Sequence, residues 1–355
     1  MFNNSSKRDI YYYYKRIKIA LSLFDIKITP EVVLNFIKDL FTFSSTKIPP
    51  IDQNKIQIAS QWIQKSNRVV FFTGAGMSAG SGISTYRGKF GLWVMGRDIS
   101  IVIIVFWMSV MFVFVISCFY TKLLSWKMFI FVNIMLLVLL ILGNILPFVG
   151  AFALSTPVGW NLFPKLSWII FKIFFFDKIV KAKLNDGHRF MEFLPTQNIS
   201  TMVITANVDG LEKKACHHVT QLHGSADKFC CLNCQRSIRT FPLTEKLPWF
   251  PPKCHQCHKR QFRTGCLLFM EDGTNSLKID SIYNIHFDDV DVAVVIGSSG
   301  IIPCGYSLIP SHIRTIEINL TPEPQTPVKK YKEKYIYIQG YQEEILKEIK
   351  SNFKY

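Results

Sequence analysis

The stretch from Val69 to Arg87 constrains the fold of this chain more than any other. It begins with a short apolar run, Val69–Phe72, which is typical of a strand buried on both faces of a parallel sheet. Four glycines then follow within nine positions, and such a turn lets a phosphate approach the main-chain amides. Because Ala79 stands where the common pattern G-x-G-x-x-G has its third glycine, an ordinary strand-to-helix turn stays open as an alternative. The glycines are Gly74, Gly76, Gly80 and Gly82.

Further short apolar segments predict a parallel sheet. Helical patterns accompany them, and the first and last of these helical patterns cover Ile51–Lys65 and Glu343–Ile349. The residues from Asn185 to His188 have the composition of a polar turn. Most of the strands end in Gly, Asn, Ser or Asp, and ligands gather at the carboxyl ends of such strands. We therefore expect an α/β fold with a Rossmann-type parallel sheet. The predicted strands are Met202–Thr205, Val219–Gly224, Asp291–Ile296, Arg314–Asn319 and Tyr335–Gly340.

Four of the nine cysteines form two C-x-x-C pairs, which indicates a metal site in a reducing compartment rather than a disulfide framework. Nineteen residues separate the pair Cys231 and Cys234 from the pair Cys254 and Cys257. Four thiolates at this spacing predict a small zinc ribbon whose Zn²⁺ is structural, since four protein ligands leave no open position. Cys230 is an alternative ligand to Cys231.

A long apolar segment interrupts the α/β pattern. Residues 99–120 and 128–164 contain no charged side chain, and each stretch is long enough to cross a hydrocarbon core of about 30 Å. Residues 94–154 are therefore a candidate transmembrane hairpin, with a membrane contact through residues 99–153. Two other interpretations stay open: translated non-coding sequence, and a buried soluble element.

The chain is basic, with 41 Lys+Arg against 25 Asp+Glu and a net charge of +16. Acidic proteins, anionic membranes and nucleic acid are candidate partners of such a surface, and a lysine-biased composition with no dedicated partner stays open as the alternative. No compact Arg/Lys run occurs, so nothing indicates nucleic-acid binding specifically. The N-terminal extension contains an amphipathic helical pattern over Glu31–Phe41 and no secretory signal.

Three polar residues stand where strands are predicted to end. His223 follows one strand and is a candidate general base, although a lone histidine is usually structural. Asn207 and Asp209 follow another strand, and their side chains suit a sugar hydroxyl and an amide. For Asp209 an Asx turn that caps a helix is the alternative.

Five motifs, in this order, make the chain resemble the sirtuins, which are NAD-dependent protein deacylases. The resemblance covers residues 55–350 apart from the apolar insert. It implies a large Rossmann-type domain and a small zinc domain, with NAD and an acylated lysine meeting between them. The motifs are G-A-G-x-S-x-x-S-G-I-x-T-[FY]-R-G, T-x-N-V-D-G-L, L-H-G, the paired C-x-x-C, and G-[ST]-S.

The resemblance also implies roles for individual residues. His223 would be the general base and Asn207 the second catalytic residue, while the four paired cysteines would bind Zn²⁺. The remaining roles concern NAD. Its binding residues would be Gly74, Ala75, Gly76, Thr85, Tyr86, Arg87, Trp93, Asn207, Val208, Asp209, His223, Gly297, Ser298, Ser299, Asn319 and Tyr341.

Composition and resemblance together divide the chain into six segments. They are an N-terminal extension (1–54), the first part of the NAD-binding domain (55–93), the apolar insert (94–154), a cofactor-binding helical segment with the Rossmann-type core (155–228), the zinc module (229–265) and the C-terminal part of the Rossmann-type domain (266–355).

The motifs are most similar to class III sirtuins, which use a Tyr and an Arg to bind acidic acyl groups. Phe171 and Phe174 occupy the corresponding positions here, so we expect poor removal of succinyl groups and a preference for neutral ones. Other departures concern the activity: Ala206 replaces a Gln, and Met270 replaces a Gly beside the substrate backbone. Ser84 and Thr264 each replace a Pro.

The resemblance thus implies transfer of an acyl group from lysine to ADP-ribose with release of nicotinamide. Two alternatives stay open: mono-ADP-ribosyl transfer by the same site, and a catalytically impaired membrane protein that binds NAD or acyl-lysine. The compartment would be a membrane if the insert is a genuine hairpin, and otherwise the mitochondrion, cytoplasm or nucleus.

Overall fold

The computed structural model describes residues 48–83, 156–235, 237–268, 271, 287–298, 309–320 and 332–353. All but the first of these residues belong to one unit, Pro49–Tyr355. The candidate hairpin 94–154 and the N-terminal helix predicted over Glu31–Phe41 lie outside the described residues. Within the described ranges, no helix combines the length and apolar character needed to span a bilayer.

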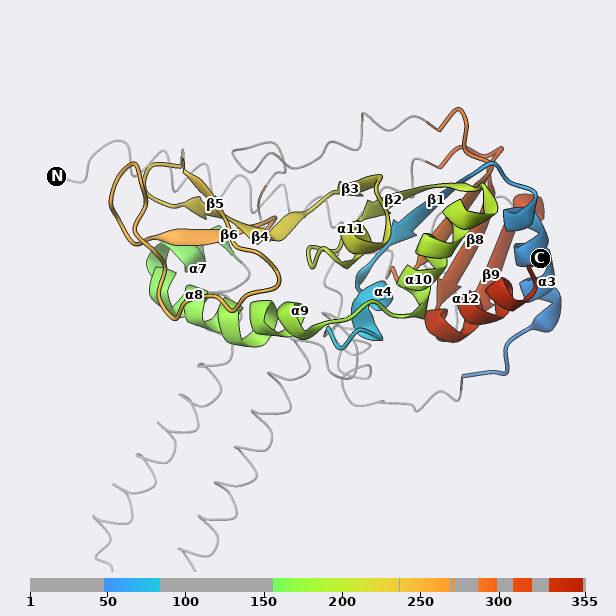
Figure 1. Cartoon of the computed structure of the whole chain (residues 1–355), viewed down its shortest axis with the longest axis horizontal. Helices are drawn as coiled ribbons and strands as arrows, with labels where there is room; N and C mark the ends of the chain where they lie inside the picture. Colours follow the sequence, from blue (N-terminus) through green and yellow to red (C-terminus); the bar gives the residue numbers. More distant parts are fainter. Residues whose placement is uncertain are drawn as a thin grey trace, which may run out of the picture. The chain divides into compact units, whose positions relative to one another are not determined.

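Six parallel strands form the central sheet, in the order β3-β2-β1-β7-β8-β9 (Figure 1). The chain runs outward from β1 to β3 on one side and from β7 to β9 on the other, so the strand order reverses between β1 and β7. Ligands bind at such a switch point, beyond the carboxyl ends of the strands. The predicted Rossmann-type sheet is confirmed. The strands are β1 (Arg68–Thr73), β2 (Ser200–Thr205), β3 (Val219–Gln221), β7 (Val292–Ile296), β8 (Arg314–Asn319) and β9 (Tyr335–Gln339).

The register of the three central strands aligns their carboxyl ends. Thr73, the last residue of β1, pairs with Thr205 of β2 on one side and with Ile296 of β7 on the other. The segments that follow these three strands therefore start from the same edge of the sheet. They carry the glycine-rich turn, the N-V-D-G-L motif and the G-S-S-G motif.

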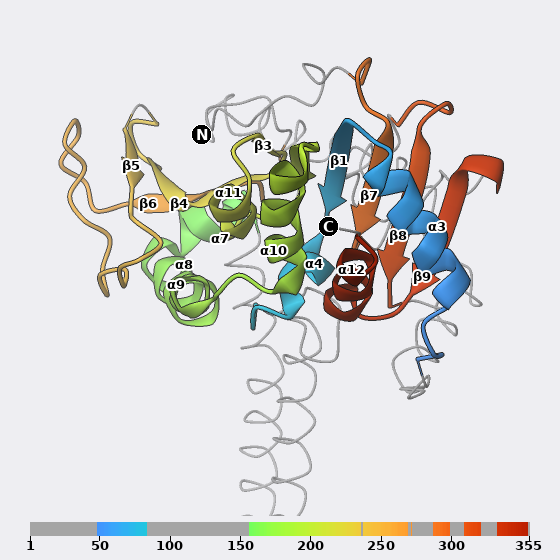
Figure 2. The same ribbon diagram turned by 45° about the vertical axis from the view of Figure 1, so that its right-hand side comes forward.

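Helices cover one face of the sheet, where α3 (Gln53–Gln64), α10 (Asp186–Phe193) and α12 (Gln342–Ser351) lie over the strands (Figure 2). Val69 and Phe71 of β1 pack into the core under these helices, whereas Val70 and Phe72 pack into a separate core on the opposite face. Because successive strand residues point to opposite faces, a strand with both faces buried is apolar throughout. This explains the uninterrupted apolar run that precedes the glycines.

A polar turn was predicted at Asn185–His188, and the structure corrects this prediction. These residues begin α10, because Asn185 is its N-cap and accepts a hydrogen bond through Oδ1 from the backbone N–H of His188 at 3.2 Å. Asn and Asp favour turns and helix N-caps for the same reason, since their short side chains bond to nearby backbone groups. Composition alone does not separate the two.

A second sheet of three antiparallel strands forms the small module, in the order β5-β4-β6. Aromatic side chains join it to the preceding helical segment, where the ring centroids of Trp168 and Phe229 are 4.9 Å apart. The strands are β4 (Gly224–Cys231), β5 (Ile238–Thr240) and β6 (Phe262–Cys266). The helical segment consists of α7 (Pro157–Leu162), α8 (Pro164–Phe171), the π-turn η1 (Lys172–Phe176) and α9 (Asp177–Lys181).

The predicted strand Val219–Gly224 is only partly correct. The structure ends β3 at Gln221 and begins β4 at Gly224, whose φ of 75° turns the chain into the small module. A Cβ at this glycine would come within 2.1 Å of the carbonyl oxygen of Gly265. The glycine therefore allows the chain to leave one sheet and enter the other, with His223 at the connection.

Candidate active site

The glycine-rich turn contacts the end of β7 through backbone atoms alone. The Gly76 N–H, in the short helix α4 (Ala75–Ala79), donates to the carbonyl oxygen of Gly297 at 3.0 Å. A Cβ on Gly76 would lie 2.6 Å from the Gly297 Cα, and Gly297 itself has a φ of 61°. Side chains at either position would separate the two loops. The cradle therefore depends on glycine, as expected for a loop whose backbone is approached by a pyrophosphate.

Asn207 is fixed against this turn. Its side-chain Nδ2 lies 3.0 Å from the carbonyl oxygen of Gly74, 3.2 Å from the Ser78 hydroxyl and 2.8 Å from Oε1 of Glu212. Its backbone N–H donates to the Thr205 hydroxyl at 2.9 Å. These contacts fix the plane of the amide and bring the end of β2 onto the turn that follows β1.

Glu212 is a functional candidate that the sequence analysis missed. It lies in α11 (Leu211–Ala215), is fully buried, and accepts hydrogen bonds at Oε1 from Thr73 and Thr205 as well as from Asn207. Its other oxygen, Oε2, has no hydrogen-bond partner among the described residues. Burying a carboxylate costs free energy unless hydrogen bonds compensate it, and the three bonds at Oε1 offset part of that cost. Because one of these bonds comes from Asn207, Glu212 is a candidate positioning residue. The only signal in the sequence was an acidic residue directly after N-V-D-G-L.

Asp209 directly precedes Gly210, the N-cap of α11, and is buried. Its Oδ1 accepts a hydrogen bond from the Leu211 N–H at 2.9 Å, so the alternative interpretation as an Asx turn describes its local structure. Burial, followed by the nearby charge of Glu212, raises the pKa of Asp209 to about 7. The carboxyl group is therefore able to donate as well as accept a hydrogen bond near neutral pH.

His223 is oriented by a backbone carbonyl. Its Nδ1 lies 3.1 Å from the carbonyl oxygen of Ala206, and because a carbonyl only accepts, Nδ1 carries the proton. Nε2 then holds a lone pair and is the ring nitrogen that is able to accept a proton. Burial lowers the pKa of His223 below its ordinary value, which keeps the ring neutral at pH 7. Both properties suit a general base.

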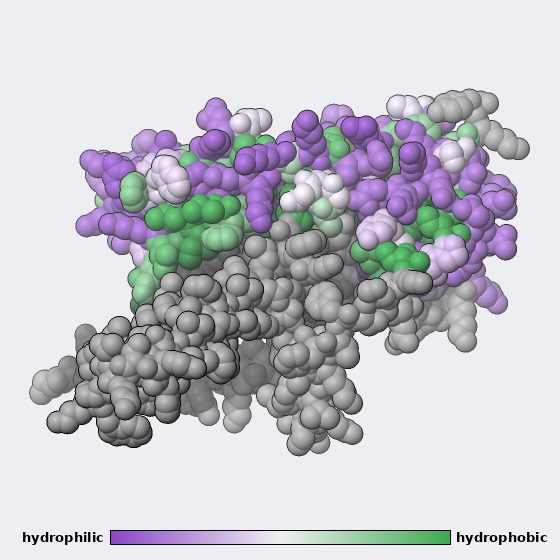
Figure 3. All heavy atoms as spheres, turned by 90° about the horizontal axis from the view of Figure 1, so that it is seen from below, coloured by the Kyte–Doolittle hydropathy of each residue, from purple (hydrophilic) through white to green (hydrophobic). Residues whose placement is uncertain are grey.

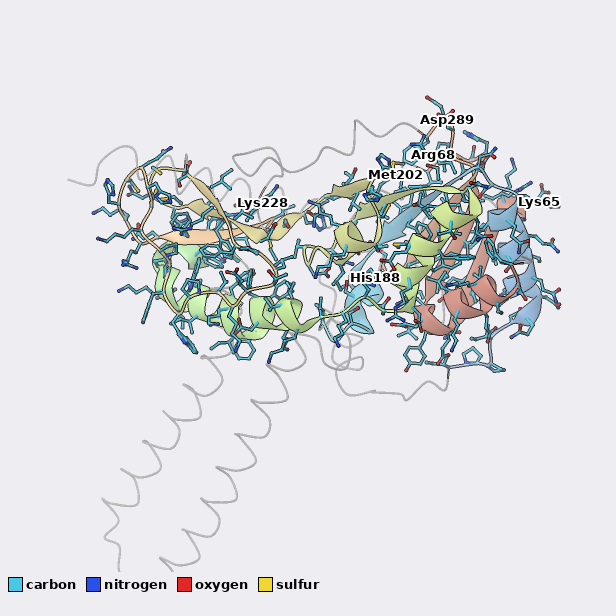
Figure 4. All side chains as sticks on the ribbon, in the orientation of Figure 1. Lys65, Arg68, His188, Met202, Lys228 and Asp289 are labelled. Atoms are coloured by element: carbon cyan, nitrogen blue, oxygen red, sulfur yellow. The ribbon has the colours of Figure 1, made fainter. Side chains whose placement is uncertain are left out.

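The adenosine side of the predicted site lies along the same edge. Asn319, at the end of β8, donates from Nδ2 to the carbonyl oxygen of Ser298 at 2.6 Å. The Gly297 N–H donates to the carbonyl oxygen of Ile318 at 3.1 Å. Tyr341 follows β9 at the start of α12 and is half exposed. Figure 4 gives the orientation: His188 marks this edge beside α4, while Arg68 and Asp289 mark the opposite edge.

The structure thus brings most of the predicted NAD-binding residues to one edge. Several predicted residues lie outside the described residues, and their roles stay predictions. They are four NAD-binding residues before the apolar insert, one after β7, and the replacements at positions 84 and 270. The residues outside are Ser84, Thr85, Tyr86, Arg87, Trp93, Met270 and Ser299.

The four predicted zinc ligands come together in the small module. Their sulfur atoms all lie within 4.8 Å of one another, with Cys231 and Cys257 3.6 Å apart and Cys234 and Cys254 3.7 Å apart. A tetrahedral ion with Zn–S bonds of about 2.3 Å requires sulfur atoms about 3.8 Å apart. The donor set therefore fits Zn²⁺. Cys230 lies outside this cluster, which settles the choice between it and Cys231.

The two positions that replace the Tyr and Arg of class III sirtuins have different environments. Phe171 is buried and packs against Trp160, Phe176 and Phe229, whereas Phe174 is exposed. Neither supplies a cation. The lysine between them, Lys172, is paired with Asp177 at 2.8 Å.

Comparisons with known proteins agree with this geometry. A model described as "Sir2 family" matches residues 153–303. A Pyrococcus furiosus protein named NAD-dependent protein deacylase is 27% identical over 281 residues, which cover 76% of this chain and 88% of that protein. An Aeropyrum pernix protein of the same name is 28% identical over 267 residues, which cover 74% and 84%.

Solved structures share the fold. A Sir2 enzyme structure superposes with a TM-score of 0.55 at 23% identity, covering 84% of this chain and 99% of that one. A Sir2 homologue in complex with ADP-ribose gives a TM-score of 0.56 at 22% identity, covering 83% and 96%. With the six-stranded sheet, the glycine cradle and the four-cysteine cluster in place, these matches show that the chain is similar to members of the Sir2 family, the sirtuins.

Proposed function

We propose that this protein is an NAD-dependent protein-lysine deacylase, which transfers the acyl group of an acylated lysine to ADP-ribose and releases nicotinamide. The observation that carries the proposal is the arrangement of His223, Asn207 and Asp209 beside the glycine cradle. The curated relatives reported above are named for the same activity.

The residues that would hold NAD are those at the carboxyl edge of the sheet. The backbone of the turn at Gly74 to Gly76 and of Gly297 would receive the pyrophosphate, Asn207 a ribose and Asp209 the nicotinamide amide. Asn319 and Tyr341 would contact the adenosine. When bound, NAD supplies an electrophilic ribose carbon with nicotinamide as the leaving group.

His223 would perform the proton transfer. Its Nδ1–H is directed to the carbonyl oxygen of Ala206, so the proton acceptor is Nε2. Because burial lowers its pKa, the ring is ready to accept a proton at neutral pH without first losing one. Asn207 is held rigidly by the turn and Glu212, so it would orient its ligand without reorganisation.

The acyl group is proposed to be neutral. Phe174 is exposed and Phe171 belongs to the aromatic core, and neither offers the charge-assisted hydrogen bonds that a succinyl carboxylate needs. Each missing bond of this kind is worth roughly 1.5–3 kcal/mol. A desuccinylation rate above the deacetylation rate would contradict this proposal.

The activity is tested with an acetyl-lysine peptide and NAD labelled in its nicotinamide. The wild-type protein should release label only when the peptide is present, and the peptide should lose its acetyl group. His223→Ala should lower kcat/KM by about 10²–10⁴-fold, the usual contribution of a general base. His217→Ala is the matched control, because His217 is exposed and lies apart from these contacts.

Two outcomes would redirect the assignment. Transfer of ADP-ribose onto the peptide, followed with label in the adenine, would favour mono-ADP-ribosyl transfer. Peptide-independent or absent nicotinamide release would favour the impaired, binding-only alternative. The transmembrane hairpin predicted for residues 94–154 stays a prediction, and alkaline carbonate extraction of the full chain from membranes checks it.

A further inference from the structure

His223 lies where the chain passes from the central sheet into the small module, and both sides hold it. On the side of the central sheet, the ring Nδ1 donates to the carbonyl oxygen of Ala206 at 3.1 Å. On the side of the module, the carbonyl oxygen of His223 accepts a hydrogen bond from the Leu267 N–H at 2.8 Å. The next residue, Gly224, pairs with Cys266 of β6. The backbone that carries the imidazole ring is therefore placed by the segment that follows β6.

An ion pair encloses this segment. Two nitrogens of the Arg263 guanidinium, Nη1 and Nη2, donate to the two carboxylate oxygens of Glu271, and the second of these bonds measures 2.8 Å. Nη2 also donates to the carbonyl oxygen of Cys266 at 3.3 Å, while Oε2 of Glu271 accepts from the Leu268 N–H at 2.9 Å. The two partners thus bind the residues on either side of Leu267. We call Arg263 and Glu271 the clasp.

The arginine of the clasp is buried, which is unusual for this residue type. Hydrophilic side chains are ordinarily exposed, as they are over much of the face shown in Figure 3. Only 9% of Arg263 is exposed, and its guanidinium makes four hydrogen bonds, one of them from Nε to the carbonyl oxygen of Thr264 at 3.1 Å. Because the guanidinium is a planar fork, these bonds fix its orientation and that of the peptide groups it contacts.

The clasp is separate from the other parts of the site. Among the described residues, the side chains of Arg263 and Glu271 make hydrogen bonds only within residues 263–271. None of these bonds reaches the four zinc ligands or the glycine cradle. A buried ion pair also contributes little net stability by itself, because the cost of desolvation offsets the attraction. Its effect is therefore best sought in the segment that it encloses.

We propose that Arg263 and Glu271 are positioning residues for His223. The clasp fixes the peptide groups around Leu267, and Leu267 in turn fixes the carbonyl oxygen of His223. The ring thereby keeps its bond to Ala206 and the direction of Nε2. Displacement of a catalytic group by about 1 Å is enough to lower a rate about 100-fold. The inference rests on the proposed deacylase function, in which His223 is the general base.

Kinetics of the full chain with NAD and an acetyl-lysine peptide test the proposal. Glu271→Ala removes the partner of Arg263 and the acceptor for the Leu268 N–H, so it should lower kcat about 10- to 100-fold. The KM for NAD should keep its wild-type value. Glu271→Gln retains one acceptor oxygen for the Leu268 N–H and should recover part of the loss. Arg260→Lys is the matched control, because this exposed arginine of the same module donates to the carbonyl oxygen of Pro251 instead.

Nuclear magnetic resonance of ¹⁵N-labelled histidine reports on the ring without requiring activity. In the wild type, His223 should show a protonated Nδ1 and an unprotonated Nε2 at neutral pH. Glu271→Ala should give a mixture of the two tautomers and faster hydrogen exchange of the Leu267 amide, whereas Arg260→Lys should retain the wild-type signals. Arg263→Lys keeps the charge but not the planar fork, so it should resemble Glu271→Ala. Unchanged zinc content and circular dichroism confirm that the variants fold.

Two outcomes would overturn the proposal. Wild-type kcat in folded Glu271→Ala would show that the ion pair does not act on the base. An unchanged His223 tautomer together with a raised KM for the peptide would assign the clasp to peptide binding instead. A wild-type protein that leaves the peptide acetylated would refute the deacylase function, and the ring signals of Glu271→Ala would then still decide whether the clasp orients His223. If Glu271→Ala does not fold, Glu271→Gln and Arg263→Lys provide the same comparison.

Discussion

Oε1 of Glu212 lies 2.8 Å from Nδ2 of Asn207 and accepts its hydrogen bond. The same oxygen accepts from the hydroxyls of Thr73 at 2.9 Å and Thr205 at 3.1 Å, which pair across β1 and β2. One buried carboxylate therefore joins the ends of two central strands to the residue that we assign to a ribose. It also places a negative charge near Asp209.

Replacing Glu212 by Gln should lower the pKa of Asp209 below about 7. Burial is the main cause of the raised pKa, so the value should stay above the ordinary 3.8 once the Glu212 charge is gone. The glutamine still offers Oε1 to Asn207. The ¹³C chemical shift of the Asp209 carboxyl, followed against pH, measures the change. Glu344→Gln, at an exposed position of α12, is the control, and an unchanged pKa in Glu212→Gln would refute the coupling.

Asp209→Asn should change how the free energy of unfolding depends on pH. The folded-state pKa of about 7 exceeds the ordinary value of 3.8, so the folded state binds more protons between these values. Protonated Asp209 contributes to the free energy of unfolding, and this contribution is fully present below about pH 4. It is lost as pH rises through 7, so the free energy of unfolding falls by roughly 4 kcal/mol over about three pH units. Asparagine keeps the Oδ1 acceptor for Leu211 and stays neutral throughout.

Urea unfolding of the wild type and of Asp209→Asn, between pH 4 and pH 7.5, measures this contribution. Taking the difference between the two proteins cancels any pH-dependent loss of metal, since both carry the same cysteines. The variant should gain stability relative to the wild type as pH rises. Parallel pH profiles would show that Asp209 does not hold a raised pKa in the folded protein.

Local patterns were sufficient to predict the sheet and the metal ligands. Strand β1 was recognisable because both faces are buried, and the turn after it because Gly76 and Gly297 meet backbone to backbone. The four cysteines were recognisable because Zn²⁺ fixes the residue type and the spacing within each pair. In these cases the constraint acts over a few neighbouring residues.

Long-range contacts were not predictable in the same way. Glu212 acquires its role from Thr73, which lies 139 positions away in sequence, and nothing near Glu212 indicates that contact. The exposure of Leu166 and Phe174 also escaped prediction, because composition alone does not show which side chains of an apolar segment are buried. Only the packing of Trp168 and Phe171 into the small module shows which residues of that segment are left exposed.

Alanine at Gly297 should destabilise the protein more than alanine at Gly82. Both glycines have a positive φ, 61° and 83°, so both substitutions carry a backbone cost of about 1–2 kcal/mol. No described atom lies within 4 Å of a Cβ at Gly82, whereas a Cβ at Gly297 would lie 2.5 Å from the Gly76 Cα. The clash should add about 1–3 kcal/mol and weaken NAD binding. Chemical denaturation and calorimetric titration with NAD measure both effects, and equal losses in the two variants would exclude the close approach of the loops.

Serine at Cys231 should remove zinc, whereas serine at the adjacent Cys230 should not. The Cys231 sulfur is one of four within 4.8 Å of one another, and loss of one thiolate leaves a tetrahedral site incomplete. The Cys230 thiol instead lies 3.8 Å from the carbonyl oxygen of Gln235 and belongs to the packing of the module.

Metal analysis should give one zinc per chain for the wild type and for Cys230→Ser. Cys231→Ser should contain little zinc and lose protection from hydrogen exchange in β4 and β6, because metal binding and folding of such a small module are coupled. Full zinc content in Cys231→Ser together with loss in Cys230→Ser would reverse the assignment of the fourth ligand.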